Sequence, residues 1–437
     1  MTGIHCRLAL TEGEAVADVR IEADSSGTIT AVGSGEPPRS GDLRLGLVLA
    51  GAVNAHSHAF HRALRGRTHG DGGDFWQWRA RMYRVAASLD PGLYRELATA
   101  VFAEMLAAGY TSVGEFHYVH HRPDGTPYRD PNAFGRSLAE AARSCGIRLT
   151  LIDTCYLTSA PGAPLLPEQT RFGDGDPDRF LGRWGALADL SGDGVTIGAA
   201  IHSVRAVPPE AIARLVEGLP DDVPLHVHLS EQPAENEQSL AEYGATPARV
   251  LADSGALTPR LSVVHATHLI DDDIALLGGA RVAAVFCPTT EADLGDGIGP
   301  ARELADAGAR IALGSDQNAV VDPFLEVRGL EGGERLRSRT RGRFSPGELD
   351  AARAAHGAAA LGLAGGLRVD AVCDLVEVDD SSVRTVGVRP DQLVMAASAQ
   401  DVLRVVVGGR LVAERGLLAD GRDPARMLGS SLPALET

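Results

Sequence analysis

Eight apolar segments rich in β-branched residues follow one another along the middle of the chain. Their hydrophobic character is continuous rather than alternating, which is typical of strands buried on both faces. Stretches of helical pattern or loop character separate the segments. The predicted strands are Leu47–His58, Thr111–Tyr118, Arg148–Tyr156, Val195–Arg205, Pro224–Glu231, Leu261–His268, Arg281–Glu291 and Arg310–Asn318.

Helical patterns between these strands end where a glycine follows. Tyr94–Ala108 is followed by Gly109 and Ala301–Ala307 by Gly308, as is common at helix C-termini. Strands that alternate with helices in this way predict an α/β fold of the (β/α)8, TIM-like barrel type.

The two ends of the chain have a different pattern, with short predicted strands and turns. Gly408-Gly409 is a predicted hairpin turn in the C-terminal part. Because neither end has enough apolar surface to fold alone, we expect both termini to form one small β-sandwich module. The expected division is 1–49 for the N-terminal part of this module, 50–365 for the barrel and 366–437 for its C-terminal part.

Polar residues recur at the C-terminal ends of the predicted strands, where a barrel has its active site. His56 and His58 end the first strand, and their spacing of two puts both imidazoles on one face. His228 ends the fifth strand and Asp316 the eighth. Three nitrogen donors and a carboxylate suit a hydrolytic zinc ion or a similar divalent metal. His226 alternates with His228, so either is a candidate for the third histidine.

Further candidates lie beside these ligands. Glu231 follows the fifth strand as a possible general acid/base, the alternative being a solvated loop glutamate. His265 ends the sixth strand, where it can polarise a substrate. His202 and Arg205 end the fourth strand, and the arginine fork suits a carboxylate, unless it forms a structural ion pair. The stretch Phe75–Tyr83 predicts either a lid or substrate wall, with Arg79 as a second anion clamp, or an amphipathic helix whose aromatic side chains pack on the barrel.

The composition narrows the possible functions. A net charge of −17 on 437 residues excludes a typical nucleic-acid partner. Without a long apolar run or a signal-peptide pattern, we expect no membrane partner and a cytoplasmic protein. All 41 basic residues are arginines. Schiff-base chemistry and a carbamylated lysine between two metals are therefore excluded, which favours a single metal.

At these residues the chain resembles the amidohydrolase superfamily, in its deaminase branch. The shared pattern is HxH on the first strand, His with Glu three residues later on the fifth, His on the sixth and Asp on the eighth. Within this superfamily the chain is similar to the formimidoylglutamate deiminases of histidine degradation. The stretches that carry this similarity are Asn54–Ala63, Asp74–Arg79, Gly114–His121, His202–Arg205 and Val264–His268.

The resemblance implies one zinc ion and the hydrolytic deimination of N-formimino-L-glutamate, a small dianion, to N-formyl-L-glutamate and ammonia. A homodimer is the general expectation for such a chain. The sequence departs from the family at His61, often a glutamine, and at Gln317-Asn318, often Ser-His. The implied roles are metal binding by His56, His58, His228 and Asp316, catalysis by Glu231, His265 and Asp316, and substrate binding by His61, Arg79, Tyr118, His202 and Arg205.

Two alternatives stay open at this point. A related deaminase of a purine, a pterin or an S-adenosylhomocysteine-like compound, or a triazine chlorohydrolase, would use the same chemistry on another substrate. A metal-binding or ligand-sensing barrel without catalysis is the other class. Glu231 and His265 argue against the second alternative, because binding alone does not require them.

Overall fold

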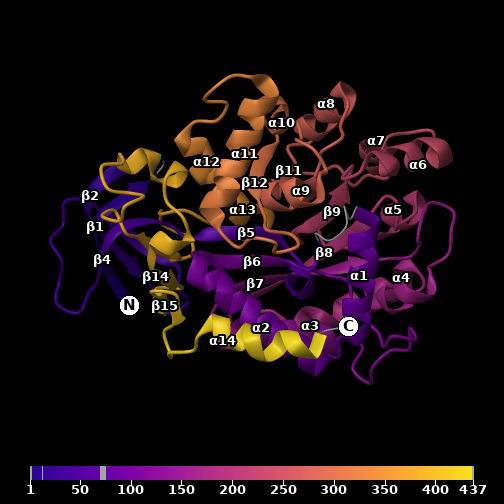
Figure 1. Ribbon diagram of the computed structural model, residues 1–437, viewed down its shortest axis with the longest axis horizontal. Coiled ribbons are helices and arrows are strands. Elements are labelled where there is room, and N and C mark those ends of the chain that lie inside the picture. The colour runs from indigo at the N-terminus through magenta and orange to yellow at the C-terminus, as the bar shows by residue number, and fades with distance from the viewer. Residues whose placement is uncertain (1, 12, 69–74, 436–437) are drawn as a thin grey trace.

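The computed structural model describes residues 2–11, 13–68 and 75–435. One of its two eight-stranded sheets consists of parallel strands whose spatial order follows the chain. Figure 1 shows this sheet at the centre of the molecule, with helices around it. The strands are β5 (Ala52–Ser57), β6 (Tyr110–His117), β7 (Arg148–Cys155), β8 (Val195–Ser203), β9 (Leu225–Leu229), β10 (Leu261–His265), β11 (Ala283–Phe286) and β12 (Arg310–Leu313). Each of the eight predicted strand segments overlaps one of them, and only β6 begins outside its segment, by one residue.

The last strand meets the first just beyond its C-terminal end. The backbone N–H groups of Ser315 and Asp316 donate to the carbonyl oxygen of His56, at 3.1 and 3.0 Å. The N–H of His58 in turn donates to the Asp316 carbonyl oxygen at 3.0 Å. A Cβ at Gly314 would lie 2.8 Å from the His56 carbonyl oxygen, so glycine permits this approach. These contacts make the sheet a nearly closed barrel, and the predicted fold class is confirmed.

The helices that surround the barrel are mostly short. α2 ends at Gly109 (φ 101°) and α10 at Gly308 (φ 111°), as predicted. The α-helices are α1 (Phe75–Ser88), α2 (Pro91–Ala108), α3 (Ala133–Cys145), α4 (Pro177–Gly185), α5 (Pro209–Gly218), α6 (Pro233–Tyr243), α7 (Pro247–Asp253), α8 (Asp271–Gly279), α9 (Pro288–Leu294), α10 (Ala301–Ala307), α11 (Pro323–Ser338), α12 (Pro346–Arg353), α13 (Ala355–Ala360) and α14 (Pro424–Ser431). Single 3-10 turns include η1 (Ala59–Leu64), η3 (Pro167–Phe172), η4 (Ala186–Leu190), η5 (Pro390–Met395), η6 (Ala399–Asp401) and η7 (Leu432–Leu435).

The two ends of the chain together form a second, mixed sheet beside the barrel, at the left of Figure 1. β4 joins its two halves, because it pairs in parallel with β1 and antiparallel with β13. β14 and β15 form the hairpin predicted at Gly408-Gly409. The strands are β1 (Thr2–Thr11), β2 (Glu14–Ala23), β3 (Ile29–Gly33), β4 (Leu43–Ala50), β13 (Leu375–Val378), β14 (Val402–Val407), β15 (Arg410–Glu414) and β16 (Leu417–Leu418).

The first predicted strand, Leu47–His58, is in fact divided between the two sheets. Its first residues belong to β4 and its last to β5, and Gly51 lies between them. The N–H of Gly51 donates to the Asp374 carbonyl oxygen at 2.9 Å, and that of Ala52 to Gly109 at 3.2 Å. Both strands are buried, so the hydrophobic pattern shows no break where the chain changes sheets.

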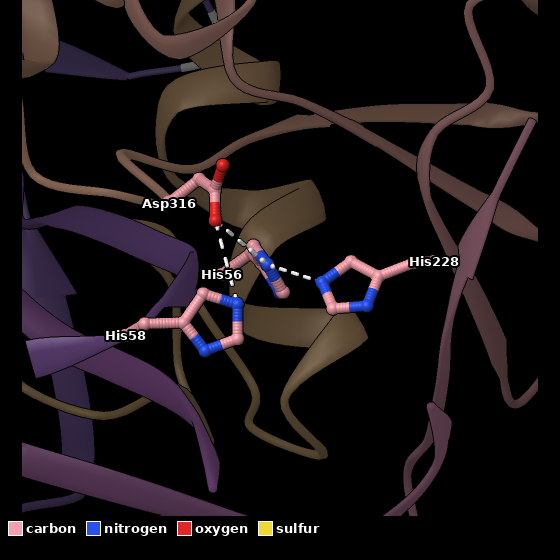
Figure 2. Close-up of side chains that lie close together, drawn as sticks. All are labelled: His56, His58, His228 and Asp316. Atoms are coloured by element: carbon pink, nitrogen blue, oxygen red, sulfur yellow. Dashed lines mark hydrogen bonds and ion pairs between the residues drawn. The ribbon is translucent and has the colours of Figure 1, made fainter. Parts of the chain in front are cut away.

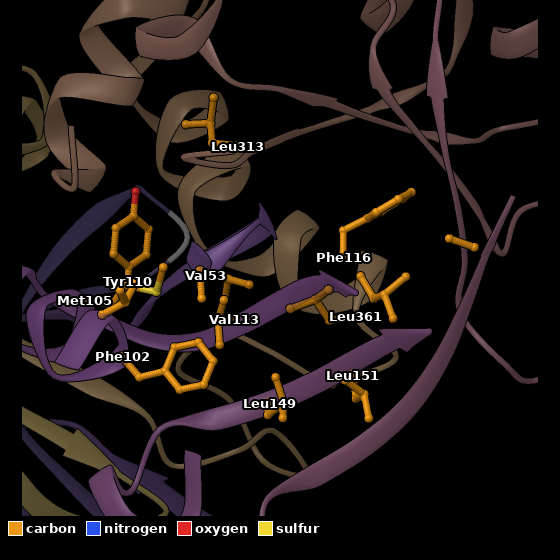
Figure 3. Close-up of a cluster of buried hydrophobic side chains, with 14 of the residues drawn as sticks. Val53, Phe102, Met105, Tyr110, Val113, Phe116, Leu149, Leu151, Leu313 and Leu361 are labelled. Atoms are coloured by element: carbon orange, nitrogen blue, oxygen red, sulfur yellow. The ribbon is translucent and has the colours of Figure 1, made fainter. Parts of the chain in front are cut away.

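Two hydrophobic cores stabilise these layers. The main core fills the barrel and the space between its strands and helices, where Val113, Leu149 and Leu151 are at most 1% exposed (Figure 3). The terminal sheet has its own core, which includes Ile4 and Val406. The five cysteines are buried and unpaired. Among the described residues, no helix is long and apolar enough to cross a membrane.

Candidate active site

Four donor side chains converge at the C-terminal end of the barrel (Figure 2). The Asp316 Oδ1 atom lies 3.4 Å from Nε2 of His56 and 3.4 Å from Nε2 of His58. Nε2 of His228 lies 3.1 Å from Nε2 of His56. One donor atom from each residue lies within 4.8 Å of the others, and all four residues are buried. The structure thus brings together the four ligands proposed from the sequence.

Backbone carbonyl groups orient two of the imidazoles. Nδ1 of His58 donates to the Phe116 carbonyl oxygen at 2.8 Å. Nδ1 of His228 donates to the His202 carbonyl oxygen at 3.0 Å. A proton on Nδ1 leaves the Nε2 lone pair free, and Nε2 is the atom that faces the other donors. Such carbonyl partners are typical behind metal-binding histidines.

The protonation states at this centre suit a divalent cation. Burial holds the pKa of His56, His58 and His228 below the usual value, which keeps the imidazoles neutral. Burial works to raise the pKa of Asp316, but the nearby histidines, with His56 first, outweigh it and hold that pKa below its usual range. Neutral imidazoles and an ionised carboxylate are the forms that bind zinc. The donor set therefore fits a divalent metal ion.

The structure distinguishes the two histidines of β9. Nε2 of His226 bonds to the Ala360 carbonyl oxygen at 2.9 Å, below the site. His226 is therefore held by α13, whereas His228 joins the other donors. Side chains two apart on a strand share a face but occupy different layers of a barrel.

Asn318 belongs to the pair Gln317-Asn318, where the sequence departs from the family pattern. Its side chain stabilises the junction between the first and last barrel strands. Its side-chain amide donates to the carbonyl oxygens of His58 and Asp316, at 3.1 and 3.2 Å. Gln317 instead donates to Asp293 Oδ2 at 2.8 Å. Asn318 therefore connects the backbones of two proposed ligands.

Glu231 and His265 lie beside the four donors, at the ends of β9 and β10. Glu231 Oε1 lies 3.8 Å from Nε2 of His265. Burial raises the pKa of Glu231, which favours a carboxyl group that can hold a proton. Burial works to lower the pKa of His265, but the charge of Glu231 and contact with Glu291 raise it to about 10. A bound cation would act against this increase.

Every substrate-binding residue proposed from the sequence lines one pocket above the four donors. Nε2 of His61 lies 3.0 Å from the Tyr118 hydroxyl. Burial lowers the pKa of His61 to about 3, so its imidazole is neutral. Arg79 Nε donates to the Tyr83 hydroxyl at 2.6 Å. The pocket is lined by His58, His61, Trp78, Arg79, Met82, Tyr83, Tyr118, Tyr156, Phe172, His202, Arg205, His228, Glu231, His265 and Asp316.

Arg205 presents a donor without an internal partner. Its Nε atom is buried and has no hydrogen-bond partner among the described residues. Its charge acts to lower the pKa of Glu231 and that of Glu235, but no ion pair joins its guanidinium to a carboxylate among the described residues. A buried guanidinium N–H that faces a pocket is a donor that an anionic ligand can satisfy.

The aromatic stretch after the first strand forms helix α1, and side chains of this helix line the pocket. The roles of lid and of anion clamp stay predictions. Asp74, which belongs to the motif, lies outside the described residues. Sequence analysis missed Tyr156 and Phe172, which complete the wall, and Gln169, which donates to the hydroxyls of Tyr83 and Tyr156, both at 2.9 Å.

A second buried group of possible ligands lies nearby, formed by His117, His120 and Asp153. Nη1 of Arg183 lies 3.0 Å from Oδ1 and 2.9 Å from Oδ2 of Asp153. This guanidinium already neutralises the carboxylate, and its charge lowers the affinity of the group for a metal cation. His120, two residues after Tyr118 of the pocket wall, also bonds through Nε2 to the Thr154 carbonyl oxygen at 2.9 Å.

A barrel with this donor set, and with a carboxylate and a histidine beside it, defines a hydrolase that uses a divalent cation. The model of the amidohydrolase family matches residues 47–412. The chain belongs to this family, and it is a hydrolase that acts on C–N bonds.

Individual relatives support the same assignment. Formimidoylglutamate deiminase from Pseudomonas aeruginosa is 36% identical over 98% of both chains. 5-Methylthioadenosine/S-adenosylhomocysteine deaminase from Syntrophobacter fumaroxidans is 29% identical over 89% of this chain and 87% of its own. The crystal structure of an amidohydrolase from Brucella melitensis superposes with a TM-score of 0.92, at 33% identity and 100% coverage of both chains.

Proposed function

We propose that the protein hydrolyses N-formimino-L-glutamate to N-formyl-L-glutamate and ammonia, a step of histidine degradation, with one zinc ion per subunit. The observation that carries this proposal is that two arginines, Arg79 and Arg205, line the same pocket as three of the four metal donors. A substrate with two carboxylates would explain why arginines line the pocket of a protein whose net charge is −17. The 36% identity to the Pseudomonas aeruginosa deiminase supports the same substrate.

The proposed reaction replaces the terminal nitrogen of the formimino group with oxygen. A divalent cation, when bound, supplies a Lewis acid and lowers the pKa of water to about 7. Asp316 accepts a proton from the attacking water, the oxygen bonds to the formimino carbon, and His265 stabilises the charge that develops there. Glu231 delivers one proton to the terminal nitrogen, and Asp316 returns the proton that it accepted from water to the same nitrogen. As the C=O bond forms and the C–N bond breaks, the remaining hydroxyl proton restores Glu231, and ammonia leaves.

The remaining pocket residues hold the substrate. Arg205 and Arg79 each offer a planar fork to a carboxylate. The hydroxyl of Tyr118, the imidazole of His202 and that of His61 add neutral hydrogen-bonding groups on the same wall. The homodimer and the cytoplasmic location stay predictions.

Purified protein should release ammonia from N-formimino-L-glutamate and lose this activity after treatment with a chelator. Zinc added back to the stripped protein should restore the rate, and metal analysis should give about one zinc per subunit. The same assay with N-formimino-L-aspartate and formamidine would show how strongly the carboxylates contribute. Absence of ammonia from every formimino compound would refute the proposed substrate.

Replacing Arg205 with alanine should lower kcat/KM for the dianionic substrate by about 100-fold, because a charged hydrogen bond contributes about 1.5–3 kcal/mol. Steady-state ammonia release checks this value. Arg214→Ala, on the surface of α5 and paired with Asp178, is the matched control and should keep the wild-type value. An unchanged kcat/KM in Arg205→Ala would exclude the proposed anion contact.

A second substrate class has one observation in its favour. Aromatic side chains of Trp78, Tyr83, Tyr118, Tyr156 and Phe172 line the pocket, as would suit a planar ring. The Syntrophobacter fumaroxidans relative is a deaminase of 5-methylthioadenosine and S-adenosylhomocysteine. Ammonia release from these nucleosides, compared with N-formimino-L-glutamate on one preparation, would separate the two candidates.

A further inference from the structure

His265 lies between two carboxylates, of which only Glu231 has a role in the proposed reaction. The other is Glu291, on α9, the short helix that follows the seventh barrel strand. Glu291 Oε1 lies 3.5 Å from Nδ1 of His265, whereas Glu231 Oε1 lies 3.8 Å from Nε2. The side chains of His265 and Glu291 are 1% and 7% exposed. The imidazole is therefore held in a buried arrangement with an acid facing each nitrogen.

The Glu291 carboxylate is fixed by its own helix. Oε1 accepts a hydrogen bond from the Cys287 N–H at 2.9 Å, at the N-terminus of α9. The Glu291 carbonyl oxygen accepts from the Asp296 N–H at 2.9 Å. Nδ1 of His265 is buried and makes no hydrogen bond of regular geometry within the described residues. Glu291 Oε1, 3.5 Å away, is the carboxylate oxygen paired with this nitrogen.

We propose that Glu291 is a positioning residue, whose carboxylate holds the His265 ring with a proton on Nδ1 and with Nε2 turned toward the reacting centre. The inference rests on the proposed function, because it gives His265 a part in the deimination. A carboxylate behind a histidine determines which ring nitrogen carries the proton and fixes the ring. Removal of such a partner typically costs about 10- to 100-fold in activity.

The first test replaces Glu291 with glutamine and with aspartate. Glu291→Gln should lower kcat about 10- to 100-fold while KM changes by less than about threefold, because Glu291 lines no part of the substrate pocket. Glu291→Asp keeps the charge and should recover part of the rate. A kcat of Glu291→Gln equal to that of the wild type would overturn the proposal.

Glu326→Gln is the matched control. Glu326 is a fully buried carboxylate that accepts hydrogen bonds from the N–H and the hydroxyl of Thr289, at 3.0 and 2.5 Å. It therefore contacts the same helix as Glu291, but not His265. Burial raises its pKa well above the usual value, so an amide resembles its protonated form. This variant should keep the wild-type kcat; an equal loss in both variants would indicate general damage to α9 and overturn the assignment.

A double-mutant cycle tests whether Glu291 acts through His265. In a His265→Asn background, Glu291→Gln should cause little further loss, because the ring that it positions is absent. Equal factors in both backgrounds would show an independent structural role and overturn the proposal.

A spectroscopic readout separates this inference from the proposed substrate. In protein labelled with [13Cε1]histidine, the His265 signal is identified by its absence in His265→Asn. That signal should shift in Glu291→Gln and stay in place in Glu326→Gln, and an unshifted signal would overturn the inference. If the wild type releases no ammonia from N-formimino-L-glutamate, the proposed function fails, while the spectrum still decides the role of Glu291.

Discussion

Replacing Glu231 with glutamine is expected to lower kcat for N-formimino-L-glutamate by about 10³-fold, within the range known for general acid/base groups. The amide keeps the size of the side chain but can neither take up nor deliver a proton. Burial already raises the pKa of this carboxyl, which favours the protonated form that can deliver a proton. Steady-state ammonia release provides kcat, and metal analysis of the same preparation should still give about one ion per subunit, because Glu231 is not one of the four donors.

Glu237→Gln, on the exposed side of α6, is the matched control and should keep the wild-type rate. If the Glu231 variant retained full activity, proton delivery would have to come from another group in the pocket. If it lost the metal together with the rate, Glu231 would instead be part of the metal centre.

The other large effect is expected from His228→Asn, compared with His226→Asn on the same strand. His228→Asn removes one of three nitrogen donors and should reduce both the metal content and kcat, the latter by about 10³-fold, because Lewis-acid assistance contributes several kcal/mol. His226→Asn removes a hydrogen bond to the Ala360 carbonyl oxygen. It should lower the free energy of unfolding by about 1–3 kcal/mol and leave the metal in place.

Metal analysis, ammonia release and thermal unfolding on the two variants check this contrast. Loss of metal in His226→Asn together with its retention in His228→Asn would exchange the two assignments. Equal metal contents in both variants would show that neither histidine is essential to the centre.

The barrel was predictable because its strands leave a strong local signal. Each is a short apolar run, and the polar residues at the run ends mark one face of the fold. The break at Gly51 was not predictable, because β4 and β5 are both buried and the chain passes between sheets without a polar residue. Hydrophobicity reports burial, but it does not report which sheet buries a strand.

The site was predictable to the extent that its residues stand at strand ends. His56, His58 and Asp316 follow from that position, whereas the choice between His226 and His228 needed the contact with α13. Glu291 was not singled out, although it ends the predicted strand Arg281–Glu291. In the structure that strand ends at Phe286 and Glu291 lies on α9, and the side of a helix that faces the site depends on tertiary packing. Gln169 was missed for the same reason, since it acts from the distant turn η3.

The junction between the first and last barrel strands has a consequence for biosynthesis. His56 and His58 leave the ribosome early. Asp316 and the backbone groups that pair with these histidines emerge only after β12, the last strand of the barrel. A nascent chain therefore carries a pair of imidazoles without their carboxylate for most of its translation. Assembly of the complete donor set must therefore await synthesis of the chain up to Asp316, which is residue 316 of 437. A truncated product ending before β12 should purify without metal.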